Sequence, residues 1–171
     1  MNKPQRPWWW AIVVVLVSAV VLAVGLFAYA WKHYYAVAPS TEYSTAGVTI
    51  GGVHLRVRVP LTEQASERGL GGVTSLSNRQ GMLWYFQPAS KPTFWMKGMK
   101  IGLDFIWIRQ GDILSINEQV PPPSSELDLP IYQPPGVVDN VLEVPAGFAA
   151  EHHLQVGDPV VIDPERLEGL Y

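Results

Sequence analysis

The chain contains no cysteine. This absence excludes disulfide bonds, a lipid anchor on an N-terminal cysteine, and any zinc site that needs thiolate ligands. The histidines, His33, His54, His152 and His153, do not stand at metal-ligand spacing on a helix, so we expect no metal site and no cofactor. A domain in this chain must therefore be stabilised by its hydrophobic core alone.

Basic residues and nucleotide-binding motifs are also scarce. The chain has 12 Lys and Arg against 15 Asp and Glu, and the basic residues are scattered, which argues against a nucleic-acid partner. The glycines at residues 69–72 follow a predicted helix instead of opening one, so they do not form a phosphate-binding loop. No serine stands in a nucleophile-elbow pattern.

Charged residues are absent from residues 7–30, which are mostly Ile, Val, Leu and Ala. As a helix this segment would reach about 36 Å, enough to cross a hydrocarbon core of about 30 Å. Aromatic clusters at residues 8–10 and 29–35 flank it, as interfacial belts do. We therefore predict a transmembrane helix whose partner is the lipid bilayer through residues 8–30.

Basic residues near this segment set its predicted orientation. Lys3 and Arg6 precede the segment and Lys32 alone follows closely, which favours a cytoplasmic N-terminus in a single-pass membrane protein. A cleaved signal peptide is the alternative, because Ala-Tyr-Ala at residues 28–30 resembles a cleavage site, and the product would then be secreted or periplasmic. We expect a stub and anchor at residues 1–36, a linker at 37–46 and a globular extracytoplasmic domain at 47–171.

The remainder of the chain predicts a mainly β domain of the sandwich or barrel-like kind, with two short helices. Residues 48–60 alternate between apolar and polar and predict one half-buried strand. Residues 103–108 are apolar on both faces, which is typical of a strand covered from both sides. The helices are expected from Thr62 to Arg68 and over residues 145–153. The proline-rich residues 121–136 predict a long surface loop, which is a lid, a partner-docking edge or an inert connection.

Two carboxylates stand inside predicted strands. Alternation places Asp104 on the face of Ile106 and Ile108, so its charge needs a partner. It is either a pocket group that binds or transfers a proton, or a structural carboxylate that accepts N–H bonds from the turn at residues 98–102. Glu143 ends a strand just before a helix and is either stabilised by that helix's N-terminus or paired with Asp104 as an acid/base site.

Aromatic residues are concentrated on the central strands, where they form either the core or a ligand groove. They are Trp84, Phe86, Phe94, Trp95, Phe105 and Trp107. Our candidate ligand-binding residues are Trp95, Lys97, Asp104 and Glu143.

Several short motifs occur together over residues 48–162. They are Gly69-Leu70, Gly81-Met82-Leu83, Phe94-Trp95-Met96-Lys97, Leu103-Asp104, Val-Leu-Glu-Val-Pro-Ala-Gly at residues 141–147, and Val156-Gly157-Asp158. Their order and spacing resemble the domain-of-unknown-function family 192, also called uncharacterised protein family 0127. The resemblance implies a compact, mainly β fold. It implies no activity, because that family has no established biochemical function.

Together these features lead us to expect a membrane-tethered extracytoplasmic binding or accessory module of the cell envelope. Its partner would be an unknown protein or a small polar ligand. One alternative is an envelope hydrolase that uses Asp104 and Glu143 as an acid/base pair, which needs the two carboxyl groups about 5–10 Å apart across a cleft. Another is a structural subunit of an envelope complex.

Overall fold

The structure is a computed structural model that describes residues 15, 17, 20–26, 29, 42–125, 127 and 129–163. The chain divides into two units, Met1–Thr41 and Glu42–Tyr171. Residues 20–26 of the first unit are helical. Within the described residues, no helix has the length and apolar character needed to cross a membrane. Most of the span predicted at residues 8–30 lies outside the described residues.

The second unit consists of strands and two short helices, so the mainly β prediction is confirmed. The helices are α2 (Glu63–Arg68) and α3 (Phe148–Glu151). The strands are β1 (Tyr43–Ile50), β2 (Val53–Pro60), β3 (Gln80–Ser90), β4 (Phe94–Trp95), β5 (Leu103–Arg109), β6 (Asp112–Val120), β7 (Ile131–Tyr132), β8 (Val138–Pro145) and β9 (Val160–Ile162).

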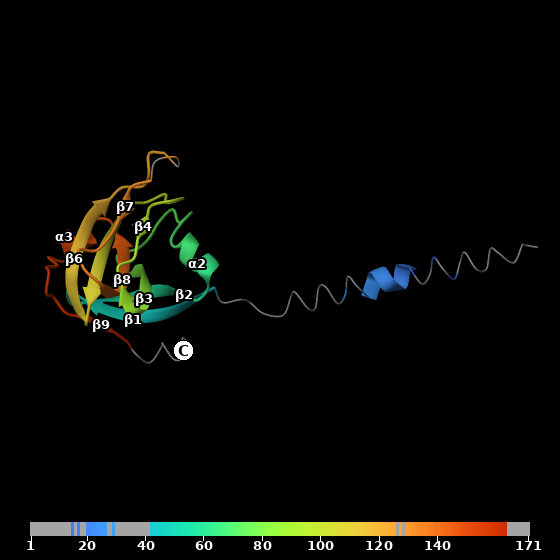
Figure 1. Ribbon diagram of the computed structural model, residues 1–171, viewed down its shortest axis with the longest axis horizontal. Coiled ribbons are helices and arrows are strands. Elements are labelled where there is room, and N and C mark those ends of the chain that lie inside the picture. The colour runs from blue at the N-terminus through green and yellow to red at the C-terminus, as the bar shows by residue number, and fades with distance from the viewer. Residues whose placement is uncertain are drawn as a thin grey trace, which may run out of the picture. The chain divides into compact units, whose positions relative to one another are not determined.

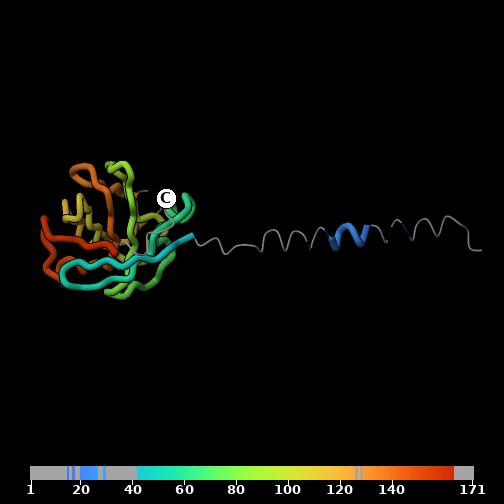
Figure 2. Tube along the Cα trace, turned by 90° about the horizontal axis from the view of Figure 1, so that it is seen from below, coloured from blue at the N-terminus to red at the C-terminus, as the bar shows by residue number. Residues whose placement is uncertain are grey.

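Seven of these strands form one curled sheet in the order β6-β5-β8-β3-β2-β1-β9 (Figure 1). Strands β2 and β3 are parallel, and the other neighbouring pairs are antiparallel. The curl brings the two edge strands together, because the Val160 N–H donates to the Gly111 carbonyl at 2.7 Å and Asp112 bridges to Pro159. Strand β9 lies beside the β1–β2 hairpin, as the red and cyan segments of Figure 2 show.

The first strand predicted from the sequence is in fact a hairpin. Gly51 and Gly52 have positive φ angles of 55° and 75° and turn the chain between β1 and β2. The hairpin pairs Ile50 with Val53. Buried residues alternate in each strand, and only a one-residue change of phase at the turn separates the two patterns, which is why they resembled one strand. Strand β1 begins at Tyr43, inside the segment that we expected to be linker, because Ala46 is buried in register with Val57.

The proline-rich loop also contains a short strand. Ile131 and Tyr132 form β7, which pairs with β4 in a separate two-stranded sheet. Tyr132 lies opposite Phe94, and its ring centroid is 5.5 Å from that of Phe105. Tyr132 of the loop therefore packs over the central strands, while Ile131 is exposed.

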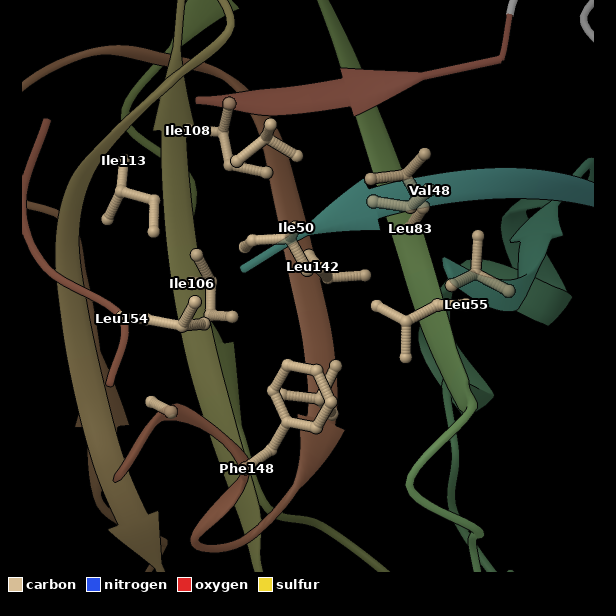
Figure 3. Packing of buried hydrophobic residues seen from close by; sticks show 14 of the residues in the cluster. Val48, Ile50, Leu55, Leu83, Ile106, Ile108, Ile113, Leu142, Phe148 and Leu154 are labelled. Atoms are coloured by element: carbon tan, nitrogen blue, oxygen red, sulfur yellow. The ribbon is translucent and has the colours of Figure 1, made fainter. Parts of the chain in front are cut away.

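The sheet carries a hydrophobic cluster on each face. Strand β5 contributes to both, because Ile106 and Ile108 pack into one cluster while Phe105 and Trp107 pack into the other. This confirms that the strand is covered from both sides. In the first cluster Ile106 lies beside Leu142 of β8, with Phe148 of α3 close to them (Figure 3). The second cluster lies under β4, β7 and the segment after α2, and it forms the floor of the pocket described next.

Candidate functional site

Helix α2 forms one wall of a pocket. The Thr62 side chain caps it by accepting the Ala65 N–H at 3.1 Å, and Gly69 ends it at a φ of 53°. Arg68, in its last turn, donates to Glu42 at 2.6 Å, and this contact raises the pKa of the Arg68 guanidinium. The cap thus stabilises the first turn of this six-residue helix, and the Arg68–Glu42 pair links its last turn to the residue that precedes β1.

The pocket has a volume of about 740 Å³ and lies between α2, β3 and the segment around β4. It contains three of the four predicted site residues, Trp95, Lys97 and Glu143. Its apolar walls include Leu70, Trp84, Phe86, Phe94, Met99 and Leu103, and its polar lining includes Glu63, Ser66, Glu67, Arg68, Gln87 and Thr93. Apolar walls with a few polar groups are typical of small-molecule sites.

Glu143 is the buried polar group of this pocket, with 5 % of its surface exposed. Its strand register places it between Met82 of β3 and Phe105 of β5. Burial raises the pKa of the Glu143 carboxyl from 4.5 to about 8, and a weaker interaction with the Trp84 indole opposes this rise. The carboxyl is therefore mostly protonated at neutral pH.

Two polar atoms in the pocket have open hydrogen-bonding capacity. Glu143 Oε2 and Trp84 Nε1 are both buried, and neither has a hydrogen-bond partner of good geometry in the described part of the chain. Buried groups of this kind cost free energy unless something satisfies them. A ligand that reaches them would gain hydrogen bonds that the protein itself does not make.

Aromatic packing gives the pocket wall its shape. The rings of Trp84 and Phe94 meet edge to face, with centroids 5.1 Å apart. Phe94 makes a second edge-to-face contact with buried Trp107 at 5.5 Å. Because these contacts favour particular ring orientations, they hold the Trp84 ring in place in the pocket wall.

Trp95 and Lys97 combine exposure with a contact to each other. Half of the Trp95 surface is exposed, and the Lys97 Nζ lies 5.9 Å from the centre of its ring. Pairing of β4 with β7 positions Trp95 opposite Ile131. The Trp95 ring is thus available as a stacking surface with a cation beside it.

Asp104 does not line this pocket. It is fully buried, and its carboxylate accepts backbone N–H groups from Gln119 at 2.7 Å, Gly147 at 3.0 Å and Ala149 at 2.8 Å. The donors come from the end of β6 and the start of α3, not from the turn at residues 98–102 as we expected. Asp104 makes no ion pair within the described residues. Its hydrogen bonds are those of a structural carboxylate.

The two predicted carboxylates are not brought together. Asp104 lies opposite Val144 and Glu143 lies opposite Phe105 in the β5–β8 pairing, so the side chains point to opposite faces of the sheet. Asp104 belongs to the face of Ile106 and Val144, and Glu143 to the face of Phe105 and the pocket. The shared acid/base site considered above is absent from this arrangement of described residues.

Sequence reasoning named Trp84 among the aromatic residues of a core or ligand groove, but not among the candidate ligand-binding residues, and it did not identify helix α2 as part of the site. Met82, Trp84 and Phe86 alternate with their neighbours, and this pattern indicates a shared face. That Glu143 lies on the same face depends on the β3–β8 register, which links residues far apart in the chain. The position of α2 depends likewise on the parallel pairing of β2 with β3.

Comparison with known proteins adds a family and a fold. The model of DUF192, described as an uncharacterized ACR, matches residues 46–162. No curated protein matches the chain. A proposed transcription regulator from Sinorhizobium meliloti 1021 has a crystal structure similar to this one, with a TM-score of 0.62, 26% identity, and coverage of 71% of this chain and 95% of that protein. The crystal structure of a protein of unknown function from Novosphingobium aromaticivorans DSM 12444 is also similar, with a TM-score of 0.59 and 27% identity. This match covers 73% of this chain and 90% of that protein.

Proposed function

Because the chain belongs to the DUF192 family, whose description assigns no activity, we propose its function from the pocket itself. The protein is a membrane-tethered, extracytoplasmic binding module of the cell envelope that holds a small polar ligand. One observation supports the proposal: the walls are apolar and aromatic, while the buried Glu143 Oε2 and Trp84 Nε1 lie near each other without making a hydrogen bond of good geometry to any described residue. Pockets of this composition bind small molecules through a few placed hydrogen bonds.

A binding role agrees better with the carboxylates than a hydrolytic one. Asp104 is occupied by three backbone N–H groups on the far face of the sheet, so it is not available as a partner for Glu143. Glu143 acting with the Trp84 N–H needs no second catalytic group in order to hold a ligand. The exposed Trp95 ring supplies a flat surface against which that ligand stacks.

A variant that fills the pocket tests this function. Ser66 is exposed on α2 and lines the pocket, so Ser66→Trp places a large ring there without disturbing the core. Gln64→Trp adds the same ring to the same helix at a position outside the pocket lining. Small molecules that co-purify with the full chain are released and identified by mass spectrometry. We expect wild type and Gln64→Trp to carry the same compound and Ser66→Trp to lose it. Equal recovery from all three proteins would contradict the proposal.

The tether is supported by the uncharged residues 7–30 and their aromatic flanks. Alkaline carbonate extraction of membranes, combined with protease treatment of intact cells or spheroplasts, tests both the tether and its orientation. We expect the full chain to stay in the membrane pellet and its domain to be digested from outside. Complete release by carbonate, or protection of the domain from protease, would contradict the tether or its orientation respectively.

A structural role in an envelope complex is the second candidate, and one exposed pair of side chains favours it. Trp95 and Ile131 lie opposite each other in the β4–β7 sheet and are 50% and 64% exposed. Ile131→Glu would disrupt a partner interface there, while Val161→Glu changes a similarly exposed position on β9 and serves as control. Loss of a specific crosslinked partner with Ile131→Glu alone would support this role.

A further inference from the structure

We propose that the pocket selects an electrically neutral ligand that places a combined hydrogen-bond donor and acceptor, such as a primary carboxamide or a hydroxyl, between Glu143 and Trp84. This inference rests on the proposed binding function and names the chemical class of its ligand.

The pairing of β3 with β8 makes Glu143 and Trp84 neighbours. Met82 pairs with Glu143 and Trp84 pairs with Val141 in the β3–β8 register. Glu143 and Trp84 are therefore diagonal neighbours on the same face of the sheet, and both line the pocket. The Trp84 indole is close enough to the Glu143 carboxyl to lower its pKa, yet Glu143 Oε2 and Trp84 Nε1 make no hydrogen bond of good geometry within the described residues, so one small functional group can contact both.

The charged groups around the pocket come from several elements. Helix α2 contributes Glu63, Glu67 and Arg68, the segment after β4 contributes Lys97, and β3 contributes the titratable Tyr85. Arg68 is engaged by Glu42, and Lys97 lies over Trp95. No cation forms an ion pair with Glu143 within the described residues. The carboxyl therefore keeps its proton at neutral pH, in agreement with a pKa of about 8.

A protonated carboxyl beside an indole N–H matches particular ligand groups. The carboxyl offers one donor and an acceptor, and the indole offers a second donor. A primary carboxamide accepts from the Trp84 N–H through its carbonyl and donates to the Glu143 carbonyl through its N–H. An ammonium has no acceptor for the indole. A carboxylate can accept from both donors, but the pocket cations are engaged elsewhere, Arg68 by Glu42 and Lys97 over Trp95, so its charge would be buried without compensation. Each charged group should therefore bind roughly 10-fold or more weakly than the neutral one.

Three probes that share one ring test this selectivity. Benzamide, benzoate and benzylamine are titrated against the full chain in lipid nanodiscs at pH 6.5, and binding is followed by ligand-observed NMR with empty nanodiscs subtracted. Ser66→Trp is the pocket-filled control. We expect benzamide to bind at least about 10-fold more tightly than either charged probe, and Ser66→Trp to abolish the difference.

The pH dependence identifies the group responsible. Between pH 6.5 and pH 9 Glu143 ionises, so the affinity of the wild type for benzylamine should rise relative to its affinity for benzamide. Glu143→Gln keeps a donor and an acceptor but cannot ionise, so it should keep benzamide binding and lose this change with pH. Glu118→Gln, at an exposed position on β6, should behave like the wild type. Trp84→Phe removes the indole donor and should lower the affinity for benzamide roughly 10-fold.

The outcomes distinguish failure of the binding site from failure of its selectivity for neutral ligands. If no probe binds in a way that Ser66→Trp abolishes, the pocket is not a binding site and the proposed function fails. If the probes bind there but benzoate or benzylamine is preferred at pH 6.5, the pocket remains a site and only the neutral-ligand inference is overturned. The comparison of probes needs the wild-type chain alone, so it stands even if a variant does not fold.

Discussion

Asp104 and Glu143 lie on neighbouring strands but point to opposite faces of the same sheet, because Asp104 is opposite Val144 and Glu143 is opposite Phe105. The face of Asp104 is closed by α3 and the end of β6, whose N–H groups satisfy its carboxylate. The face of Glu143 opens into the pocket, where Oε2 has no hydrogen-bond partner among the described residues. The Asp104 carboxylate therefore contributes to the stability of the domain, whereas the Glu143 carboxyl can contact a ligand in the pocket.

Removal of the Asp104 carboxylate should destabilise the domain strongly. Asp104→Ala leaves three buried backbone N–H groups without their acceptor, so we expect a loss of about 3 kcal/mol or more in the free energy of unfolding. Pulse proteolysis of the full chain in urea measures this change. Asp139→Ala is the matched control, since Asp139 accepts only one N–H, that of Gln110 at 2.8 Å, within the described residues. Equal losses for the two variants would contradict the structural role of Asp104.

Glu143 should make the domain less stable as the pH rises. Its pKa is 4.5 in the unfolded chain and about 8 in the fold, so between these values the unfolded state gives up a proton that the folded state keeps. The contribution of Glu143 to the free energy of unfolding therefore falls from pH 4.5 to pH 8 and is constant outside that window. The full difference is on the order of 5 kcal/mol.

Glu143→Gln measures this contribution directly. The variant cannot ionise, so its stability relative to wild type should increase steadily between pH 4.5 and pH 8. Pulse proteolysis at several pH values gives the difference, and Glu118→Gln, at an exposed position, controls for the loss of a surface carboxylate. A stability difference that does not change with pH would show that Glu143 is already ionised in the fold.

The sequence predicted those features of the fold that depend on neighbouring residues. The both-face burial of Leu103 to Ile108 and the Thr62 cap of α2 follow from local patterns, and the structure confirms both. The Gly51–Gly52 turn was not predicted, because buried positions alternate on both sides of it and only their phase changes, from Val48 and Ile50 to Leu55 and Val57. A turn of this kind is hard to predict when the two-residue alternation of apolar residues continues on both sides of it.

The pocket could be predicted only in part, for a related reason. Trp95 and Lys97 are two residues apart, and an aromatic ring near a cation is visible in the sequence. The separation of Asp104 from Glu143 is set by the register between β5 and β8, and a shift of one residue would bring both carboxyl groups to the same face. Local patterns place each carboxylate in a strand but do not determine that register, so the acid/base pair stayed open as an alternative to the binding module.

Gly81 should be intolerant of even a methyl group. A Cβ at this position would collide with the Glu143 carbonyl oxygen of the neighbouring strand, and backbone cannot move aside as a flexible side chain can. We expect Gly81→Ala to lower the free energy of unfolding by about 1–3 kcal/mol. Gly136→Ala is the control, because its Cβ would make an ordinary contact of 3.6 Å with Leu114. Pulse proteolysis that found the two variants equally stable would contradict the close approach of β3 to β8.

The Thr62 hydroxyl should link the stability of α2 to ligand binding. This six-residue helix is too short to be stable in isolation, and its first turn depends on the 3.1 Å bond between the Thr62 hydroxyl and the Ala65 N–H. Thr62→Ala should cost about 1 kcal/mol and speed hydrogen exchange at Ala65 and Ser66, measured on the full chain by mass spectrometry.

Since Ser66, Glu67 and Arg68 of the same helix line the pocket, Thr62→Ala should also weaken benzamide binding severalfold. Thr62→Ser keeps the hydroxyl and should restore both the exchange protection and the affinity. Faster exchange in Thr62→Ala with unchanged affinity would mean that α2 borders the pocket without shaping it, and the ligand contacts would then have to come from the sheet and from Trp95.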